Sequence, residues 1–310
     1  MRRRSFLGAL AACPTLSAAE RAEPELRIAV NQTIIESAPL LLQETPGVQV
    51  VPVASGRLAS AQLMNGTVDA ATGSETQALL NSVTQPDLRI ILTLSECRYR
   101  LVARRSAGIR EVADLRGKRV ASTRNTSAEY FLSEMLGTAG LKESDVSLFS
   151  LEGEAMPAAL TRQEIDAVAI WEPHAQNAID LLGIDAQILE NPAVYHERFG
   201  LNTTVRVLKD PAKRRTLVSL VRAITAISAK IRSSPGGLVG KLANAIAIPE
   251  PLITKVWGRF RFPAELDEHQ LRSVLVPLEL WAATISQRQP RHQAMLAAII
   301  DVSVLAGARM

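Results

Sequence analysis

Short apolar strands alternate with helices over the first two thirds of the chain, and this alternation constrains the fold more than any other feature. We predict a first series of strands at 26–30, 48–53, 68–71, 88–94 and 99–103, and a second at 119–122, 146–151, 167–170, 186–189 and 205–208. Most of the intervening segments have helical patterns of about ten residues, which is typical of parallel α/β layers. The predicted fold class is therefore α/β, in two successive segments.

From residue 211 onwards the pattern changes to a helical one. Leu217, Leu220, Val221 and Ile224 follow the i, i+3, i+4 spacing that places apolar side chains on one face of a helix. The sequence therefore predicts a helical C-terminal tail that packs on one of the α/β segments.

Composition excludes several classes of protein. Of 310 residues, 47% are hydrophobic and 21% are charged, which is ordinary for globular domains and excludes a disordered or collagen-like chain. No uncharged apolar run reaches the roughly 18 residues that a membrane-spanning helix needs. The net charge is +4, and removal of Arg2, Arg3 and Arg4 would leave +1. With no basic stripe, no nucleic-acid partner is expected.

The N-terminus is typical of an export signal. Arginines at positions 2–4 precede an apolar stretch at 6–12, and the order Arg-Arg-Ser-Phe-Leu resembles a twin-arginine signal. Two processing sites fit: cleavage after Ala19, which removes 1–19, or lipidation of Cys13 after a lipobox-like Leu-Ala-Ala. A buried N-terminal helix is the remaining alternative. We expect a periplasmic protein, soluble or lipid-anchored through Cys13.

No motif for catalysis or metal binding is found. The chain lacks the phosphate-loop, dinucleotide-binding, HExxH and GxSxG patterns, and its four histidines are scattered. Cys97 is the single cysteine beyond the leader, and we interpret it as a buried structural thiol. Glu152 and Glu154 are interpreted as solvated loop residues. The predictions are therefore no enzyme, no catalytic residue, no metal and no cofactor.

Small hydroxyl-rich segments follow several predicted strands and begin the next helices. In open α/β sheets, ligands bind beyond the carboxyl ends of strands, and helix N-termini favour anions. The candidate ligand-binding residues in these segments are Ser55, Gly56, Ser74, Glu75, Thr123, Asn125, Thr126 and Ser127. The alternative is helix capping, since Thr126 and Glu129 form a capping-box pattern. A carboxylate such as Glu75 favours a ligand that also carries hydrogen-bond donors.

A second candidate is the run 170–174, in which Trp171 and Glu172 follow a strand and Pro173 begins a helix. A lone tryptophan is often a core residue. At the end of a strand, Trp171 is also suited to line a ligand cleft, with Glu172 beside it.

Four ordered runs resemble the periplasmic solute-binding proteins for sulfonates, taurine and nitrate. They are GTVDAATGS at 66–74, DLRGKRVA at 114–121, SAEYFL at 127–132 and IDAVAIWEP at 165–173. The ordered resemblance covers residues 26–207, and the combination is more specific than any single run. The helical tail resembles the family only in character.

The resemblance implies a type II periplasmic-binding-protein fold, with two α/β lobes joined by two crossing strands. It assigns residues 26–103 and 208–310, including the helical tail, to lobe one and 104–207 to lobe two. The ten candidates would then face one another across a cleft that closes on a small molecule. The implied function is that of a monomeric solute-binding component of an ABC importer, which delivers a small polar, anionic ligand to a permease in the inner membrane.

Two other functions remain open for this fold. One is an enzyme related to the thiamine-pyrimidine synthases, which resemble this family but carry a cysteine-rich iron motif that is absent here. The other is the ligand-sensing effector domain of a transcription factor, which would need a DNA-binding segment, and only the leader precedes Leu26.

Overall fold

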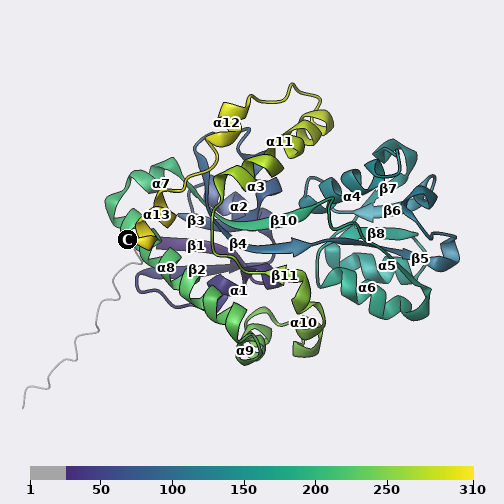
Figure 1. Ribbon diagram of the computed structural model, residues 1–310, viewed down its shortest axis with the longest axis horizontal. Helices are drawn as coiled ribbons and strands as arrows, with labels where there is room; N and C mark the ends of the chain where they lie inside the picture. Colours follow the sequence, from purple (N-terminus) through teal and green to yellow (C-terminus); the bar gives the residue numbers. More distant parts are fainter. Residues whose placement is uncertain (1–25) are drawn as a thin grey trace, which may run out of the picture.

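A computed structural model describes residues 26–310 as two α/β lobes side by side (Figure 1). Each lobe is built on its own sheet, of six strands in the first lobe and five in the second. The expected export signal at 1–19, and with it Cys13, lies outside the described residues.

The first sheet has the strand order β11-β4-β10-β3-β1-β2. Its strands are β1 (Leu26–Asn31), β2 (Val48–Val53), β3 (Ala70–Ser74), β4 (Leu88–Arg98), β10 (His196–Thr204) and β11 (Phe260–Arg261). Strand β1 pairs in parallel with β2 and β3, whereas β10 is antiparallel to β3 and to β4. The helices between these strands are α1 (Ala38–Leu41), α2 (Gly56–Met64) and α3 (Glu75–Asn81), with a 3-10 turn, η1 (Ile35–Ser37), before α1.

The second sheet has the order β7-β6-β8-β5-β9. Its strands are β5 (Arg100–Arg104), β6 (Arg119–Ser122), β7 (Ser147–Ser150), β8 (Ala167–Ile170) and β9 (Ala186–Leu189). The accompanying helices are α4 (Ser127–Gly137), α5 (Met156–Thr161) and α6 (His174–Leu182). The 3-10 turns of this lobe are η2 (Arg105–Ala107), η3 (Val112–Leu115), η4 (Glu143–Asp145), η5 (Gly153–Ala155) and η6 (Gly183–Asp185). The predicted α/β alternation is present in both lobes.

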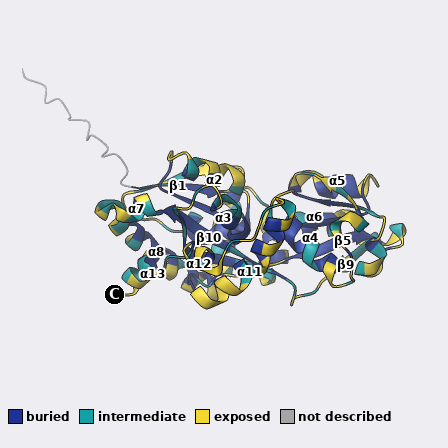
Figure 2. Cartoon of the chain, turned by 90° about the horizontal axis from the view of Figure 1, so that it is seen from above, coloured by how far each residue is buried: buried dark blue, intermediate teal, exposed yellow. Residues whose placement is uncertain are grey.

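Burial explains why these segments form strands. Central strands such as β8 (AVAI) are buried at every residue, as continuous apolar runs in a sheet covered on both faces should be. The buried residues fill the interior of each lobe, with exposed residues on the outer helices (Figure 2). Cys97 is among the buried residues and is a free thiol, as predicted.

The chain crosses between the lobes twice. Strand β4 ends at Arg98 and β5 begins at Arg100, so that Tyr99 is the first crossing point, and residues 190–195 form the return path into β10. Strand β5 therefore belongs to the second sheet and β10 to the first. These pairings move the lobe boundaries from the expected 103/104 and 207/208 to about residues 99 and 195.

The strand predicted at 205–208 is wrong. This segment is helix α7 (Val205–Lys209), and the hydroxyl of Thr204 caps it by accepting a hydrogen bond from the Val207 amide at 3.4 Å. The strand that was missed, β10, lies immediately before it. Its sequence HERFGLNTT has no apolar alternation, because the strand is buried on both faces with polar side chains that bond internally.

The C-terminal tail is helical, as predicted, and packs mainly on lobe one. It comprises α8 (Pro211–Ser233), α9 (Gly236–Ile246), α10 (Glu250–Val256), α11 (Glu268–Ile285), α12 (Gln293–Ala297) and α13 (Ser303–Arg309), with η7 (Trp257–Arg259) before β11. It also contacts lobe two: Lys255 pairs with Asp180 at 2.9 Å, and the Trp281 ring packs on Tyr130.

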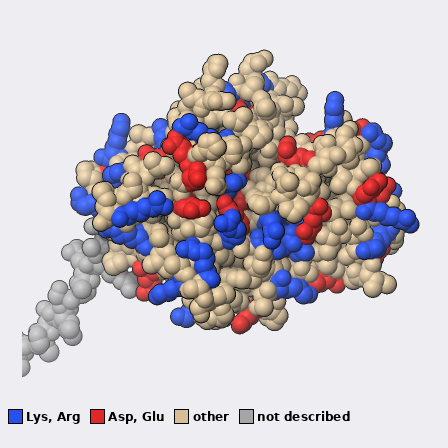
Figure 3. Space-filling view, in the orientation of Figure 1, with Lys and Arg blue, Asp and Glu red and all other residues tan. Residues whose placement is uncertain are grey.

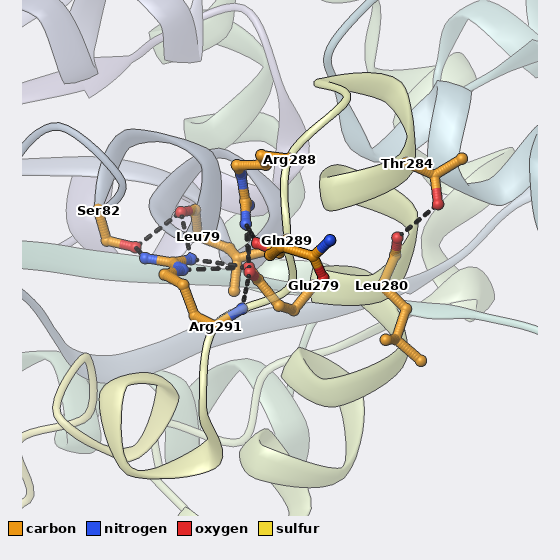
Figure 4. Close-up of polar contacts among 8 residues, drawn as sticks. All are labelled: Leu79, Ser82, Glu279, Leu280, Thr284, Arg288, Gln289 and Arg291. Carbon is orange, nitrogen blue, oxygen red and sulfur yellow. Dashed lines mark hydrogen bonds and ion pairs between the residues drawn. The ribbon is translucent and has the colours of Figure 1, made fainter.

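A network of ion pairs and hydrogen bonds links the C-terminal tail to helix α3 (Figure 4). The Glu279 carboxylate on α11 accepts hydrogen bonds from the guanidinium groups of Arg288 and Arg291. Arg291 in turn donates to the Ser82 hydroxyl at 3.0 Å and to the Leu79 carbonyl at 3.2 Å, at the C-terminal end of α3. A cation in this position satisfies carbonyl groups that a helix end leaves free.

Basic and acidic side chains are interspersed over the face of the molecule drawn in Figure 3. Within residues 26–310, no helix is both long enough and apolar enough to cross a membrane.

Candidate functional site

A cavity of about 390 Å³ lies between the lobes and takes its walls from both. Lobe one supplies the segments after β1, β2 and β3, and lobe two supplies the start of α4 and the segments after β7 and β8. The lining residues are Asn31, Thr33, Ile34, Glu36, Ala54, Ser55, Gly56, Arg57, Ser74, Gln77, Tyr99, Thr126, Ser127, Glu152, Glu154, Trp171, His174, Glu197 and Phe199. The cavity thus lies beyond the carboxyl ends of strands, where the sequence analysis expected it.

On the lobe-one wall, three of the expected ligand-binding residues line the cavity, Ser55, Gly56 and Ser74. Ser55 is the N-cap of α2 and accepts from the Leu58 amide at 3.2 Å, while Ser74 caps α3 and accepts from the Gln77 amide at 3.1 Å. Both hydroxyls therefore perform the capping role that the sequence left open, and both still face the cavity.

On the lobe-two wall, Thr126 and Ser127 line the cavity at the start of α4. Thr126 caps the helix by accepting from the Ala128 amide at 3.2 Å, and its hydroxyl donates to the Thr123 carbonyl at 2.6 Å. The predicted capping box is not formed, since Thr126 accepts from the Ala128 amide and not from that of Glu129, and Glu129 accepts from the Asn125 amide at 2.6 Å and not from that of Thr126.

Trp171 also lines the cavity, at the end of β8. The ring is half-buried and meets the imidazole of His174 edge-on, with centroids 6.3 Å apart. Burial lowers the pKa of His174, which favours its neutral form in this wall.

Four expected ligand-binding residues do not line the cavity. Glu172 is buried in ion pairs with Arg100 at 2.7 Å and Arg259 at 3.3 Å. Glu75 is 1% exposed; its carboxylate accepts from the Tyr195 hydroxyl and the Arg198 amide.

The other two expected residues, Thr123 and Asn125, shape the turn before α4. The Thr123 hydroxyl donates to the Leu151 carbonyl at 2.9 Å, and Asn125 adopts a left-handed backbone with φ of 57°. Glu75, Glu172 and Thr123 are thus buried and held by partners of their own, whereas Asn125 is exposed.

The most buried acidic groups of the lining are Glu36 and Glu197, which the sequence analysis did not single out. Glu197 Oε1 accepts from the Tyr99 hydroxyl at 2.7 Å and from the Ser127 hydroxyl at 2.8 Å. Burial, with Coulombic repulsion from Glu75 second, raises the pKa of Glu197 to about 8. Burial, with repulsion from Glu197 second, likewise raises the pKa of Glu36 well above its ordinary value.

Some of the missed residues carry a signal that the sequence could have provided. Asn31 ends β1, and Thr33 and Glu36 lie in the segment after it, so the strand-end rule used for Ser55 and Ser74 would have found them. Tyr99 lies at the crossing between the lobes and Glu197 lies on β10, and neither has such a signal.

The outer part of the lining is mixed in charge. Glu152 and Glu154 are exposed, as interpreted from the sequence, yet they also line the cavity. Arg57 is exposed and reaches across from lobe one, donating from Nη2 to the Arg124 carbonyl at 3.4 Å. In the part of the chain that the structure describes, no group of three or more histidine, cysteine or acidic residues could hold a metal ion.

A family model described as NMT1/THI5 like matches residues 47–226, more than half of the chain. A protein of Escherichia coli, named for a proposed role in binding aliphatic sulfonates, is 26% identical over 189 residues, which are 61% of this chain and 54% of that protein. A Brucella abortus protein named for a proposed binding role is 35% identical over 66 residues, 21% of each chain. The matches therefore span between a fifth and about half of these relatives' lengths.

Solved structures show the same fold over most of the chain. The periplasmic aliphatic sulphonate binding protein SsuA from Escherichia coli aligns with a TM-score of 0.72 at 20% identity, covering 87% of this chain and 90% of that one. The alkanesulfonate-binding protein SsuA from Xanthomonas axonopodis pv. citri, bound to MOPS, aligns with a TM-score of 0.71 at 21% identity, covering 90% and 99%. The expected two-lobe periplasmic-binding-protein fold is thereby confirmed.

Proposed function

Because the chain belongs to the NMT1/THI5-like family, we propose that it is the extracytoplasmic solute-binding component of an ABC importer. It captures a small polar solute with an anionic group, of the sulfonate, taurine or nitrate type, and delivers it to a permease in the inner membrane. The protein acts as a monomer and performs no catalytic step. The observation that carries this proposal is the cavity whose walls come from both lobes.

The geometry suits capture by closure. A ligand that contacts both walls interacts with more groups when the lobes are closed, and it therefore shifts the hinge equilibrium toward the closed state. Within residues 26–310, Tyr99 and the return path at 190–195 are the covalent links between the two sheets, and the motion would hinge on them. The closed, loaded form is the one that the permease would recognise.

The lining suits a small polar solute. Hydroxyls at the starts of α2, α3 and α4 offer hydrogen bonds, and the helix starts themselves favour an anionic group. Trp171 and Phe199 supply apolar surface for the rest of the ligand. The names of the sulfonate-binding relatives support this class of solute.

The test is ligand-induced stabilisation and closure of the chain from Glu20 onwards. A panel of alkanesulfonates, taurine and nitrate, together with a small-molecule extract of cells, is screened by thermal shift. A ligand at about 100 times its Kd adds roughly 2.7 kcal/mol to the free energy of unfolding. Small-angle X-ray scattering should show a smaller radius of gyration with the same ligand. If neither the panel nor the extract changes the Tm or the shape, the proposal is wrong.

Variants of the cavity walls connect the binding to this site. Trp171→Ala and Thr126→Ala should each abolish the ligand-induced shift while the protein still unfolds cooperatively. Thr138→Ala at the other end of α4 is the matched control, since its hydroxyl bonds only the local Met135 carbonyl. Normal binding by both wall variants would place the ligand elsewhere.

A further inference from the structure

Two buried carboxyl groups, Glu36 and Glu197, face the same cavity from different elements of lobe one. Glu36 lies on the turn η1 after β1 and is 1% exposed, and Glu197 lies on β10 and is 4% exposed. Both line the cavity, and each raises the electrostatic energy of the other when ionised. A folded chain rarely places two such groups together unless a partner compensates them.

Glu36 has an atom for which the described chain offers no partner. Its Oε2 is fully buried and makes no hydrogen bond. Glu197 is different, because its Oε1 already accepts from the Tyr99 and Ser127 hydroxyls. Glu197 is thus held in position, while Glu36 has unused hydrogen-bonding capacity at the cavity.

The nearby cations are engaged by other carboxylates. Within residues 26–310, no Lys, Arg or His forms an ion pair with Glu36 or Glu197. Arg259 instead pairs with Glu190 at 3.0 Å and with Glu172, which also pairs with Arg100. The one arginine of the lining, Arg57, is exposed, with its guanidinium on the Arg124 carbonyl.

We propose that Glu36 and Glu197 form a subsite for a positively charged nitrogen group, so that the solute carries an ammonium or guanidinium in addition to any anionic group. This inference rests on the proposed solute-binding function and narrows its ligand class. The anionic group of such a zwitterion is held at the helix starts of the cavity wall, and the charged nitrogen donates to the two carboxylates. A plain alkanesulfonate or nitrate leaves these carboxyls uncompensated.

The pKa shifts of the two carboxyls agree with this assignment. Burial raises the pKa of Glu36 and of Glu197. Repulsion from Glu197 and from Glu172 before α6 adds to the shift of Glu36, and repulsion from Glu75 on α3 adds to that of Glu197, while the hydrogen bonds from Tyr99 and Ser127 oppose it. Cys97 on β4 and Tyr195 on the return path are the other titratable groups around the pair, and burial raises the pKa of each. A neutral carboxyl is the stable form of a buried, unpaired acid. An arriving cation therefore displaces a proton, which leaves to solvent, and forms charge-assisted hydrogen bonds with the carboxylates.

The test compares probes that differ only in the nitrogen group. Taurine is compared with ethanesulfonate, and 3-aminopropanesulfonate with propanesulfonate, by isothermal titration calorimetry at pH 8. Charge-assisted hydrogen bonds to a buried carboxylate should make each amino compound bind roughly 10- to 100-fold more tightly than its partner. The enthalpy should also depend on the ionisation enthalpy of the buffer, since a proton is released.

Glu36→Gln isolates the subsite from the rest of the cavity. The amide keeps the shape of the side chain but cannot become a carboxylate, so the preference for the amino compounds should fall by at least about tenfold. The ligand-free variant should melt at the same temperature as the wild type or higher, because the uncompensated acid is gone. Glu44→Gln, at an exposed position of the same lobe, is the control that makes the same replacement away from the cavity.

The outcomes separate the two proposals. If ethanesulfonate binds as tightly as taurine, or if Glu36→Gln keeps the wild-type preference, the subsite is refuted and the solute-binding function stands. If the protein binds neither amino compound, the subsite is also refuted. The screen of the cell extract then decides the solute-binding function independently. If the wild type binds the amino compounds more tightly than their partners and Glu36→Gln loses this preference, the subsite is supported.

Discussion

Replacement of Glu279 by glutamine should weaken the attachment of the C-terminal tail to α3 and lower the free energy of unfolding. Glu279 is 1% exposed and accepts hydrogen bonds from two guanidinium groups and from the Arg291 amide at 2.7 Å. Glutamine can accept some of these bonds, but it cannot neutralise Arg288 and Arg291. Both arginines would then be left in a largely buried site without a counter-charge.

The pKa of Glu279 gives the magnitude. Hydrogen bonds from Arg288 and Arg291 outweigh the effect of burial and lower the pKa to about 2. The ordinary value for an unfolded chain is about 4.3, and each unit of difference corresponds to about 1.36 kcal/mol. The carboxylate therefore contributes about 3 kcal/mol to the free energy of unfolding at neutral pH.

The pH dependence identifies the cause. Because the pKa is depressed in the folded state, the contribution is complete above about pH 4.3 and disappears as the pH falls toward 2. The free energies of unfolding of wild type and Glu279→Gln, measured in urea, should differ by about 3 kcal/mol at pH 7 and by clearly less at pH 3. Glu268→Gln, which removes an exposed carboxylate from the same helix, should cost less than about 1 kcal/mol. A difference for Glu279→Gln that is below 1 kcal/mol at pH 7, or that is independent of pH, would refute the reasoning.

Two further predictions concern the cavity and lobe two. The pKa of Glu197 is about 8 without ligand, so its carboxylate forms between pH 7 and pH 9. The affinity for 2-guanidinoethanesulfonate, whose cation does not titrate in this range, should therefore rise from pH 7 to pH 9 in calorimetry. Glu197→Gln should flatten this rise. A constant affinity in the wild type would contradict the role of Glu197. In lobe two, Asp166 accepts from Arg104 at 2.7 Å and from Arg119 at 2.8 Å, and its pKa is about 2. Asp166→Asn should therefore cost about 2 kcal/mol in urea unfolding at pH 7, with a smaller loss at pH 3; an unchanged midpoint would show that the ion pairs are not coupled to unfolding.

The sequence predicts most of the fold because the strands are apolar and their ends are marked. The alternation of β1, α2 and β3 is visible in the chain, and so are the helix stop at Gly66 and the apolar face of α8. Strand β10 is the exception. It lies between β3 and β4, and the Cβ of any residue replacing Gly200 would lie 3.0 Å from the Leu92 carbonyl oxygen. Tertiary packing, rather than local periodicity, makes this segment a strand.

The candidate site is predictable only where local structure positions it. Ser55, Ser74 and Thr126 follow strands and cap helices, so their place in the cavity follows from neighbouring residues. Glu197 reaches the cavity only because a polar strand returns to lobe one after the whole of lobe two. Glu75 has the residue type of a ligand contact and the right spacing, but its partners hold it behind the wall.

The position of β10 has a consequence for the order in which the lobes form. The strands of lobe two, β5 to β9, are contiguous at 100–189, whereas β3 and β4 are joined in the first sheet only through β10, which ends at residue 204. Until β10 arrives, β3 and β4 each present an unpaired edge. A nascent or refolding chain should therefore complete lobe two first and close lobe one last, with slow kinetics set by this long-range pairing. The strand that supplies Glu197 to the cavity is thus the one that joins the two parts of the first sheet.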